Sequence, residues 1–367
     1  MRTIRRAPLP IAVLTGLIFL AAFAPLIATA APWVWKDPNG VLRFPAWERC
    51  GLQDMLWMVL SGVILLSVGT AWRGRAWKPL LALGGGVVFC LVVASFLGTP
   101  SRGSEVPWDA GALGGDVLLS APVPHSPEDL TLGRRLKEPS ASHVFGTDRL
   151  GRDVLSSVLH GLRVSLLVGF GSVLIAAFVG VLLGATAAYR GGLADDLLSG
   201  LMQVLSAFPG LLLLLLVFLA LEPRVGSMIL VLAAMGWVTP ARLIRTEVMR
   251  LRHAPHVELA RTIGISSVRI LRVYVLPYAL PPVQVHASLA VAGAILLEST
   301  LSFLGLSGAD HISLGILLRD GRESLPDGKH LILFPGFVLL ALVLSLHSLA
   351  DRLGPRLAPT DAEEALL

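Results

Sequence analysis

The segment from Arg252 to Tyr278 constrains the fold of this chain more than any other stretch. It is rich in arginine and lies between strongly apolar segments. A charged side chain at the centre of a bilayer costs roughly 2.5–3.5 kcal/mol, so this segment has to lie outside the hydrocarbon. Its excess of arginine over acidic residues predicts the cytoplasmic side. Seven arginines fall in or just before it: Arg242, Arg245, Arg250, Arg252, Arg261, Arg269 and Arg272.

The order of residues in this segment predicts two short helices joined by a turn. Pro255 can begin a helix that continues to Ile263, and Gly264 then permits a reversal of the backbone. Ser266 or Ser267 can cap the second helix. We call the segment Arg252–Tyr278 the elbow; the plainer alternative is a solvated loop between two spans.

The composition of the whole chain is that of a polytopic membrane protein. Of 367 residues, 54% are hydrophobic and only 15% are charged. The net charge of +5 does not indicate nucleic-acid binding, because the arginines cluster at the ends of apolar segments, as the positive-inside rule requires. The two cysteines, Cys50 and Cys90, form no metal or redox motif.

Eight apolar segments predict an all-α, polytopic transmembrane bundle of about eight spans, with both termini cytoplasmic. The first follows a basic N-terminus but is longer than the core of a cleaved signal peptide, so we expect it to remain as a span. The predicted spans are 10–31, 52–72, 80–97, 162–189, 195–221, 225–244, 281–306 and 331–349.

The pattern also predicts a division of the chain. An N-terminal region, 1–98, carries three spans, and 99–145 is an extracytoplasmic loop without a long apolar run. A second membrane domain occupies 146–356, with the cytoplasmic loop 247–280 inside it, and 357–367 is a C-terminal tail.

Single residues inside the spans add further expectations. Asp148 can cap a short amphipathic helix that leads into the fourth span. Pro209, after Phe208, predicts a kink in the fifth. Glu298 is an intramembrane carboxylate, which is either a functional group or an interhelical hydrogen-bonding group, and the sequence leaves both open.

The elbow resembles the "EAA" signature of permease subunits in ATP-binding-cassette importers. The resemblance rests on Glu258, Ala260, Gly264 and the pair Leu276-Pro277. The chain departs from the family pattern at Leu259, where the family has alanine, and at Tyr274, where it has isoleucine. Both replacements are hydrophobic and leave the turn intact.

Other blocks are similar to the dipeptide, oligopeptide and nickel permease family, specifically to its C-type subunits. The string from Gly146 to Asp153 looks like the family's "GTD-x-x-GRD" block, with matches at Gly146, Thr147, Asp148, Gly151, Arg152 and Asp153. The segments Gly236–Arg242 and Asp351–Arg356 are also similar. The resemblance covers Phe145 to Arg356, and the helix pair in Leu52–Leu97 is extra to the family pattern.

The resemblance implies a type I importer core that forms half of a translocation path and couples it to ATPases. Its expected partners are a second homologous permease, two ATP-binding-cassette subunits, an extracytoplasmic solute-binding protein and the lipid bilayer of the bacterial inner membrane. It implies no cofactor, metal or catalytic residue of its own. The expected coupling residues are Glu258, Leu259, Ala260, Gly264, Leu276 and Pro277, and the expected path residues are Glu298 and Pro209.

Motifs for other chemistry are missing from the sequence. It has no phosphate-binding Gly-x4-Gly-Lys-Ser/Thr loop, no His-Glu-x2-His zinc motif and no Gly-x-Ser-x-Gly nucleophile elbow. The rival classes are an intramembrane enzyme, which would need partners for Glu298, and an ion-coupled secondary transporter, which often shows repeated halves. The substrate stays open among dipeptides, oligopeptides, nickel chelates, glutathione and related small solutes.

Overall fold

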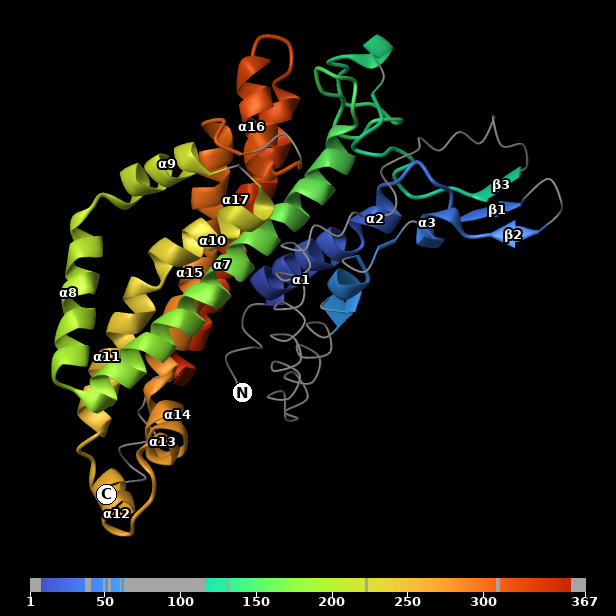
Figure 1. The fold of residues 1–367 in the computed structure, drawn as a ribbon. Coiled ribbons are helices and arrows are strands. Elements are labelled where there is room, and N and C mark those ends of the chain that lie inside the picture. The colour runs from blue at the N-terminus through green and yellow to red at the C-terminus, as the bar shows by residue number, and fades with distance from the viewer. Residues whose placement is uncertain are drawn as a thin grey trace. The chain divides into compact units, whose positions relative to one another are not determined.

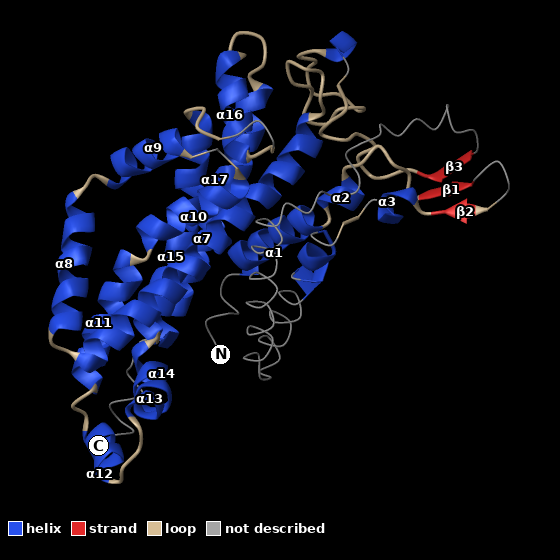
Figure 2. Cartoon of the chain, in the orientation of Figure 1, coloured by secondary structure: helices blue, strands red, loops and turns tan. Residues whose placement is uncertain are grey.

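A computed structural model describes most of the chain as helix, with one small sheet (Figures 1 and 2). The described residues are 8–36, 41–48, 50–51, 54–59, 61–62, 116–130, 132–221, 224–307 and 311–357. The second predicted span is therefore described only in part, and that part is helical. The third predicted span, 80–97, and the tail from 358 onward lie outside the described residues.

Four described helices are long and apolar enough to cross a membrane, or five if one bent pair counts as a single span. The bent pair consists of α8 (Leu193–Ala207) and α9 (Gly210–Ala220). The described residues thus account for fewer than the eight predicted spans. The four are Val154–Arg190 (α7), Val225–Leu251 (α10, Val225–Gly236, with α11, Val238–Leu251), Pro281–Phe303 (α15) and His330–Asp351 in α17 (His330–Leu357).

The first predicted span is shorter than expected. Helix α1 (Pro8–Ala22) ends before a turn at Phe23, and the four-residue α2 (Ala24–Ile27) follows it. Helical structure in this predicted span therefore ends at Ile27 rather than at residue 31, and Ala28 forms a bridge with Val123. Composition shows how far an apolar segment extends. It does not show where the helix within that segment ends, because this depends on pairing with a distant residue such as Val123.

The all-α prediction also needs a correction. Three short strands, β1 (Val34–Lys36), β2 (Leu42–Arg43) and β3 (Asp116–Leu119), form an antiparallel sheet in the order β2-β1-β3. Figure 2 shows the three strands of this sheet in red, and the described residues contain no other strand. The strand β3 lies inside the segment 99–145, which was expected to be a loop.

The chain divides into two compact units. The first comprises Met1–Val168, Arg224–Gly226 and Ile295–Ser345, and the second comprises Gly169–Pro223, Ser227–Ala294 and Leu346–Leu367. In the first unit, α2 packs on the start of α7, where Ala24 and Ala28 surround Leu159. An ion pair between Asp54 and Arg163 joins the described part of the second predicted span to α7.

The segment 307–330, between the last two predicted spans, contains a helix that was not predicted from the sequence. Helix α16 (Leu314–Glu323) begins at Ser313, whose hydroxyl accepts a hydrogen bond from the Ile316 amide. It packs closely on α17, because a Cβ at Gly321 would lie 2.8 Å from the Leu331 carbonyl oxygen.

The second unit is built on close contact between α7 and α11. A Cβ at Gly180 would lie 2.7 Å from the Trp237 carbonyl oxygen, so only glycine permits this approach. A buried cluster that includes Trp237 and Ala241 packs around this crossing. The block Gly236–Arg242 therefore contributes to helix packing.

Candidate functional site

The first helix of the elbow is α12 (Pro255–Thr262), as the sequence predicts. Ala254 has extended backbone angles, and its carbonyl oxygen accepts hydrogen bonds from the amides of Val257 and Glu258. Pro255 occupies the first turn, where a missing N–H costs nothing. The acidic side chain of Glu258 lies in the same turn, where the helix dipole favours a negative charge.

The turn after α12 is a Schellman motif. The Ile265 amide donates to the Ala260 carbonyl at 3.1 Å, and the Gly264 amide donates to the Arg261 carbonyl at 3.0 Å. Gly264 has φ +80°, the left-handed conformation that this motif requires. A Cβ at Gly264 would have no neighbouring atom within 4 Å, so the constraint on this residue within the chain is conformational.

One face of α12 anchors the elbow to the second unit. Val257 and Ala260 are buried in an apolar cluster, with the ends of α7 and α11 around them. The Arg252 guanidinium donates to the Ala188 carbonyl at 2.9 Å, and the Arg261 guanidinium lies 5.6 Å from the centre of the Tyr189 ring. The buried members of the cluster are Ala185, Ala188, Ile244, Val248, Leu251, Val257, Ala260, Ile270, Val275, Ala279 and Val283.

The opposite face of α12 is exposed and partly apolar. Leu259 is 64% exposed and Ile263 is 68% exposed, and Glu258 is exposed beside them. Val268, just beyond the turn, is 77% exposed. A helix held firmly by one face, with an apolar and charged opposite face, has the form of a docking element.

The second half of the elbow is less regular than expected. Ser266 precedes the short α13 (Ser267–Arg269) but makes no capping hydrogen bond with its side chain. A π-helical segment, Ile270–Val275, follows and leads into α14 (Leu276–Ala279). The helix thus continues past Pro277, with the Leu276 amide bonded to the Leu271 carbonyl.

The irregularity has a chemical cause in Pro277, which has no N–H to donate within the preceding turn. Leu276 is half-buried, and Pro277 is exposed. The loop between α11 and α15 thus carries all six expected coupling residues within one unit. Of these, Ala260 is buried and Glu258 and Leu259 lie on the exposed face.

The predicted kink at Pro209 is a complete break between two helices. The axes of α8 and α9 differ by 86°, with Phe208 and Pro209 in extended conformation between them (Figure 1). Both residues are exposed. The bend makes this pair either a broken span or a re-entrant segment.

Glu298 is sealed inside the first unit. It is 0% exposed, and its carboxylate accepts hydrogen bonds from Ser165 on α7 and Ser302 on α15, both at 2.8 Å. Ser299 donates a longer bond of 3.3 Å, and Ser313 adds a further hydroxyl contact. We call Glu298 and these hydroxyls the serine cluster; its geometry is that of the interhelical hydrogen-bonding alternative.

The block Gly146–Asp153 starts α7 differently from the prediction. Asp153, not Asp148, caps the helix, because its carboxylate accepts the Ser156 amide at 2.8 Å. The Asp148 carboxylate instead accepts the amides of Leu150 and Arg152, and it also pairs with the Arg152 guanidinium at 2.6 Å. No separate amphipathic helix precedes the span, since α7 runs unbroken from Val154 to Arg190.

One ion pair of the second unit, between Arg245 and Asp195, was not predicted from the sequence. Arg245 donates two hydrogen bonds to the Asp195 carboxylate, at 2.6 and 2.7 Å, and so joins α11 to the first turn of α8. The residues are 50 positions apart, and no local spacing pairs them. The sequence offers only a weak indication of this pair. Asp195 lies at the start of one predicted span, and Arg245 directly follows the end of the next predicted span.

Comparison with known proteins places residues 155–359 in one family model, described as "Binding-protein-dependent transport system inner membrane component". The dipeptide transport system permease protein DppC of Bacillus subtilis is 36% identical over 238 residues, which cover 64% of this chain and 74% of that protein.

Two further relatives have a similar sequence identity to this chain. The oligopeptide transport system permease protein OppC of Haemophilus influenzae is 34% identical over 220 residues, or 60% of this chain and 71% of that protein. The probable D,D-dipeptide transport system permease protein DdpC of Escherichia coli is 35% identical over 237 residues, which cover 64% of this chain and 79% of that protein.

Proposed function

Because this chain belongs to the family of binding-protein-dependent transport system inner membrane components, we propose that it is a permease subunit of a peptide importer. Membership makes it a transport subunit of the inner membrane rather than an enzyme. The similarity to DppC, OppC and DdpC supports peptides or a related small solute as the cargo.

The proposed assembly is that of an ATP-binding-cassette importer. This chain would pair with a second, homologous permease, bind two ATPase subunits on the cytoplasmic side and receive substrate from an extracytoplasmic solute-binding protein. ATP hydrolysis would take place on the ATPase subunits, since the sequence has no phosphate-binding loop.

We also propose eight spans with both termini cytoplasmic, made of an N-terminal region (1–98), an outer loop (99–145), a permease domain (146–356) and a tail (357–367). A cysteine placed at Ser126 tests the orientation. It should react with an impermeant maleimide added to intact cells, and reaction only after lysis would contradict this topology.

The elbow is the proposed coupling element, and the single observation that carries this proposal is the two-faced α12. A coupling element has to be rigidly attached to the spans and must also present a surface to a partner. The buried Val257 and Ala260 provide the attachment. The exposed Glu258 and Leu259 provide the surface.

The remaining residues have supporting roles in this proposal. Gly264 closes α12, and Leu276 and Pro277 join the elbow to α15 through α14. In the translocation path, Pro209 would set the bend between α8 and α9. Glu298 would act by holding α15 to α7 through Ser165.

The coupling proposal is tested by paired variants at Gly264. Gly264→Val should be strained, because a β-branched residue disfavours φ +80°. Gly264→Asn is the matched control, because asparagine tolerates this conformation at a helix end. Glu258→Arg reverses a charge on the exposed face without touching the anchor.

Peptide uptake in intact cells and co-purification of the ATPases are then measured on the same membranes. Gly264→Val and Glu258→Arg should insert normally and lose most uptake, by about tenfold or more if docking loses 1.4 kcal/mol. Gly264→Asn should transport. Normal uptake in both Gly264→Val and Glu258→Arg would remove the coupling assignment.

A further inference from the structure

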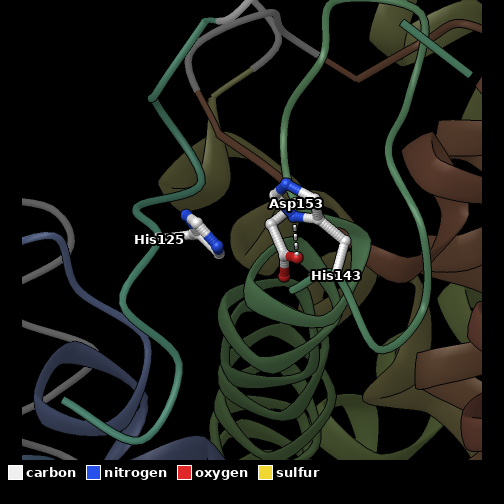
Figure 3. Close-up of side chains that lie close together, drawn as sticks. All are labelled: His125, His143 and Asp153. Carbon is white, nitrogen blue, oxygen red and sulfur yellow. Dashed lines mark hydrogen bonds and ion pairs between the residues drawn. The ribbon is translucent and has the colours of Figure 1, made fainter. Parts of the chain in front are cut away.

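Three side chains of metal-ligand type converge just before α7, apart from the elbow. His125, His143 and Asp153 each offer a ligand atom, and these atoms all lie within 4.8 Å of one another (Figure 3). They come from three parts of the first unit: the segment after β3, the turn before α7 and the cap of α7. Neither the coupling proposal nor the transport path uses them.

Asp153 and His143 form the fixed part of the group. Both are buried, and His143 Nδ1 lies 2.8 Å from one carboxylate oxygen of Asp153. The other oxygen accepts the Ser156 amide. His143 Nε2 has no hydrogen-bond partner among the described residues, so the ring is oriented through Nδ1.

His125 is held in a way that leaves one nitrogen available. Its Nε2 lies 3.1 Å from the Ser142 carbonyl oxygen. A carbonyl oxygen only accepts, so Nε2 carries the proton and Nδ1 carries the lone pair. A histidine that donates one N–H to a backbone carbonyl and offers its other nitrogen is the usual arrangement of a metal ligand.

A purely structural role accounts for only part of this group. The pair of Asp153 and His143 explains how α7 is capped and how the preceding turn is held. It does not explain His125, which is half-buried and stacks on the His143 ring with centroids 4.4 Å apart. Two imidazoles and one carboxylate are also a ligand set that zinc uses in proteins.

We propose that His125, His143 and Asp153 bind one divalent transition-metal ion of the zinc type. The ion takes the place of the proton between His143 Nδ1 and the Asp153 oxygen. The proton of the neutral imidazole then resides on Nε2, so that His143 binds the ion as a neutral ligand. Ligand atoms around a tetrahedral zinc ion lie roughly 3.3 Å apart, so the His125 ring has to turn towards the other two. His125 is the least buried of the three and is the one able to move.

The consequence of binding is a fixed joint between the outer segment and the first long helix. The ion would connect residues 28 and 10 positions before Asp153 directly to the first turn of α7. The charge of Asp153 is needed here, because the exposed amides of a helix start repel a cation. A fourth coordination position would remain for water.

The experiment measures metal binding to the full-length chain in detergent after removal of any polyhistidine tag. Equilibrium dialysis against Zn²⁺ should give one equivalent per chain, and Co²⁺ should give the intense visible absorption of a four-coordinate site. His125→Gln and Asp153→Asn should each weaken binding by about tenfold or more. Asp153→Asn keeps an oxygen for the Ser156 amide, so it separates the metal site from the helix cap.

The matched control is His253→Gln, which removes an exposed histidine from the other unit. It should bind the ion as the unchanged chain does. Equal binding by the unchanged chain and by the double variant His125→Gln/Asp153→Asn would overturn the proposal. A Co²⁺ spectrum unaffected by His125→Gln would overturn it as well, because the ion would then be bound elsewhere. The readout does not involve transport, so its failure leaves the importer proposal untouched.

Discussion

The elbow and the serine cluster each contain a glutamate that the sequence makes a candidate for a functional role, but the two environments are opposite. Glu258 lies on the exposed face of α12, where its own chain leaves it free to meet a partner. Glu298 is fully buried and is surrounded by hydroxyls of its own chain. Burial and internal hydrogen bonding therefore distinguish a carboxylate that is suited to hold helices together from one that is suited to an interface.

The sharpest test of this contrast is Glu298→Ala, which should cause the largest loss of stability. The change leaves buried hydroxyls without their acceptor, at about 1–3 kcal/mol each. Serines in helices can bond to a preceding carbonyl instead, so we expect a total of about 3 kcal/mol. The measurement is the denaturation midpoint of the purified protein in detergent. Glu298→Gln, which keeps an acceptor oxygen, is the control and should lose much less; equal losses would show that the carboxyl hydrogen bonds do not hold the helices.

The pair of Asp195 and Arg245 is an intermediate case, since its side chains are 11% and 25% exposed. Water near these groups weakens the pair, so we expect a coupling energy of about 1 kcal/mol. A double-mutant cycle with Asp195→Asn and Arg245→Gln measures this coupling free of other effects. We expect polar contacts to contribute less to stability as their exposure increases. A coupling energy as large as the stability lost in Glu298→Ala would contradict this order.

The smallest change in stability is expected for Leu259→Ser on the outer face of α12. Leu259 is 64% exposed, so the loss should be under about 0.5 kcal/mol. Uptake should fall nevertheless if this face binds the ATPases. Ala260→Ser, on the buried face of the same helix, is the matched comparison and should cost more stability. Loss of stability by Leu259→Ser with normal uptake would contradict the assignment of the two faces.

Local chemistry made the elbow predictable from the sequence. Pro255 begins α12 and Gly264 ends it, and each acts through its own backbone preference. The break at Pro209 was predictable for the same reason, although its size was not. The apolar segments of the second half were also recognisable, because a membrane span depends on composition over about 20 neighbouring residues.

Features that depend on distant residues could not be predicted. The strand β3 pairs with β1 across about 80 residues of sequence, and no local pattern specifies that register. The partners of Glu298 include Ser165, which is 133 positions away. Helix α16 is a partial exception, because Ser313 followed by leucines at 314, 317 and 318 is a capped amphipathic pattern that could have been read.

The unbroken helix α7 has a mechanical consequence. Its 37 residues measure roughly 55 Å at 1.5 Å per residue, whereas the hydrocarbon core of a bilayer is about 30 Å thick. Unless it tilts strongly, the helix therefore extends well beyond the hydrocarbon as a stiff rod. A change in tilt of about 10° would displace one end by roughly 10 Å relative to the other. A single helix that starts at the Asp153 cap and ends beside Arg252 can thus act as a lever between the two faces of the membrane.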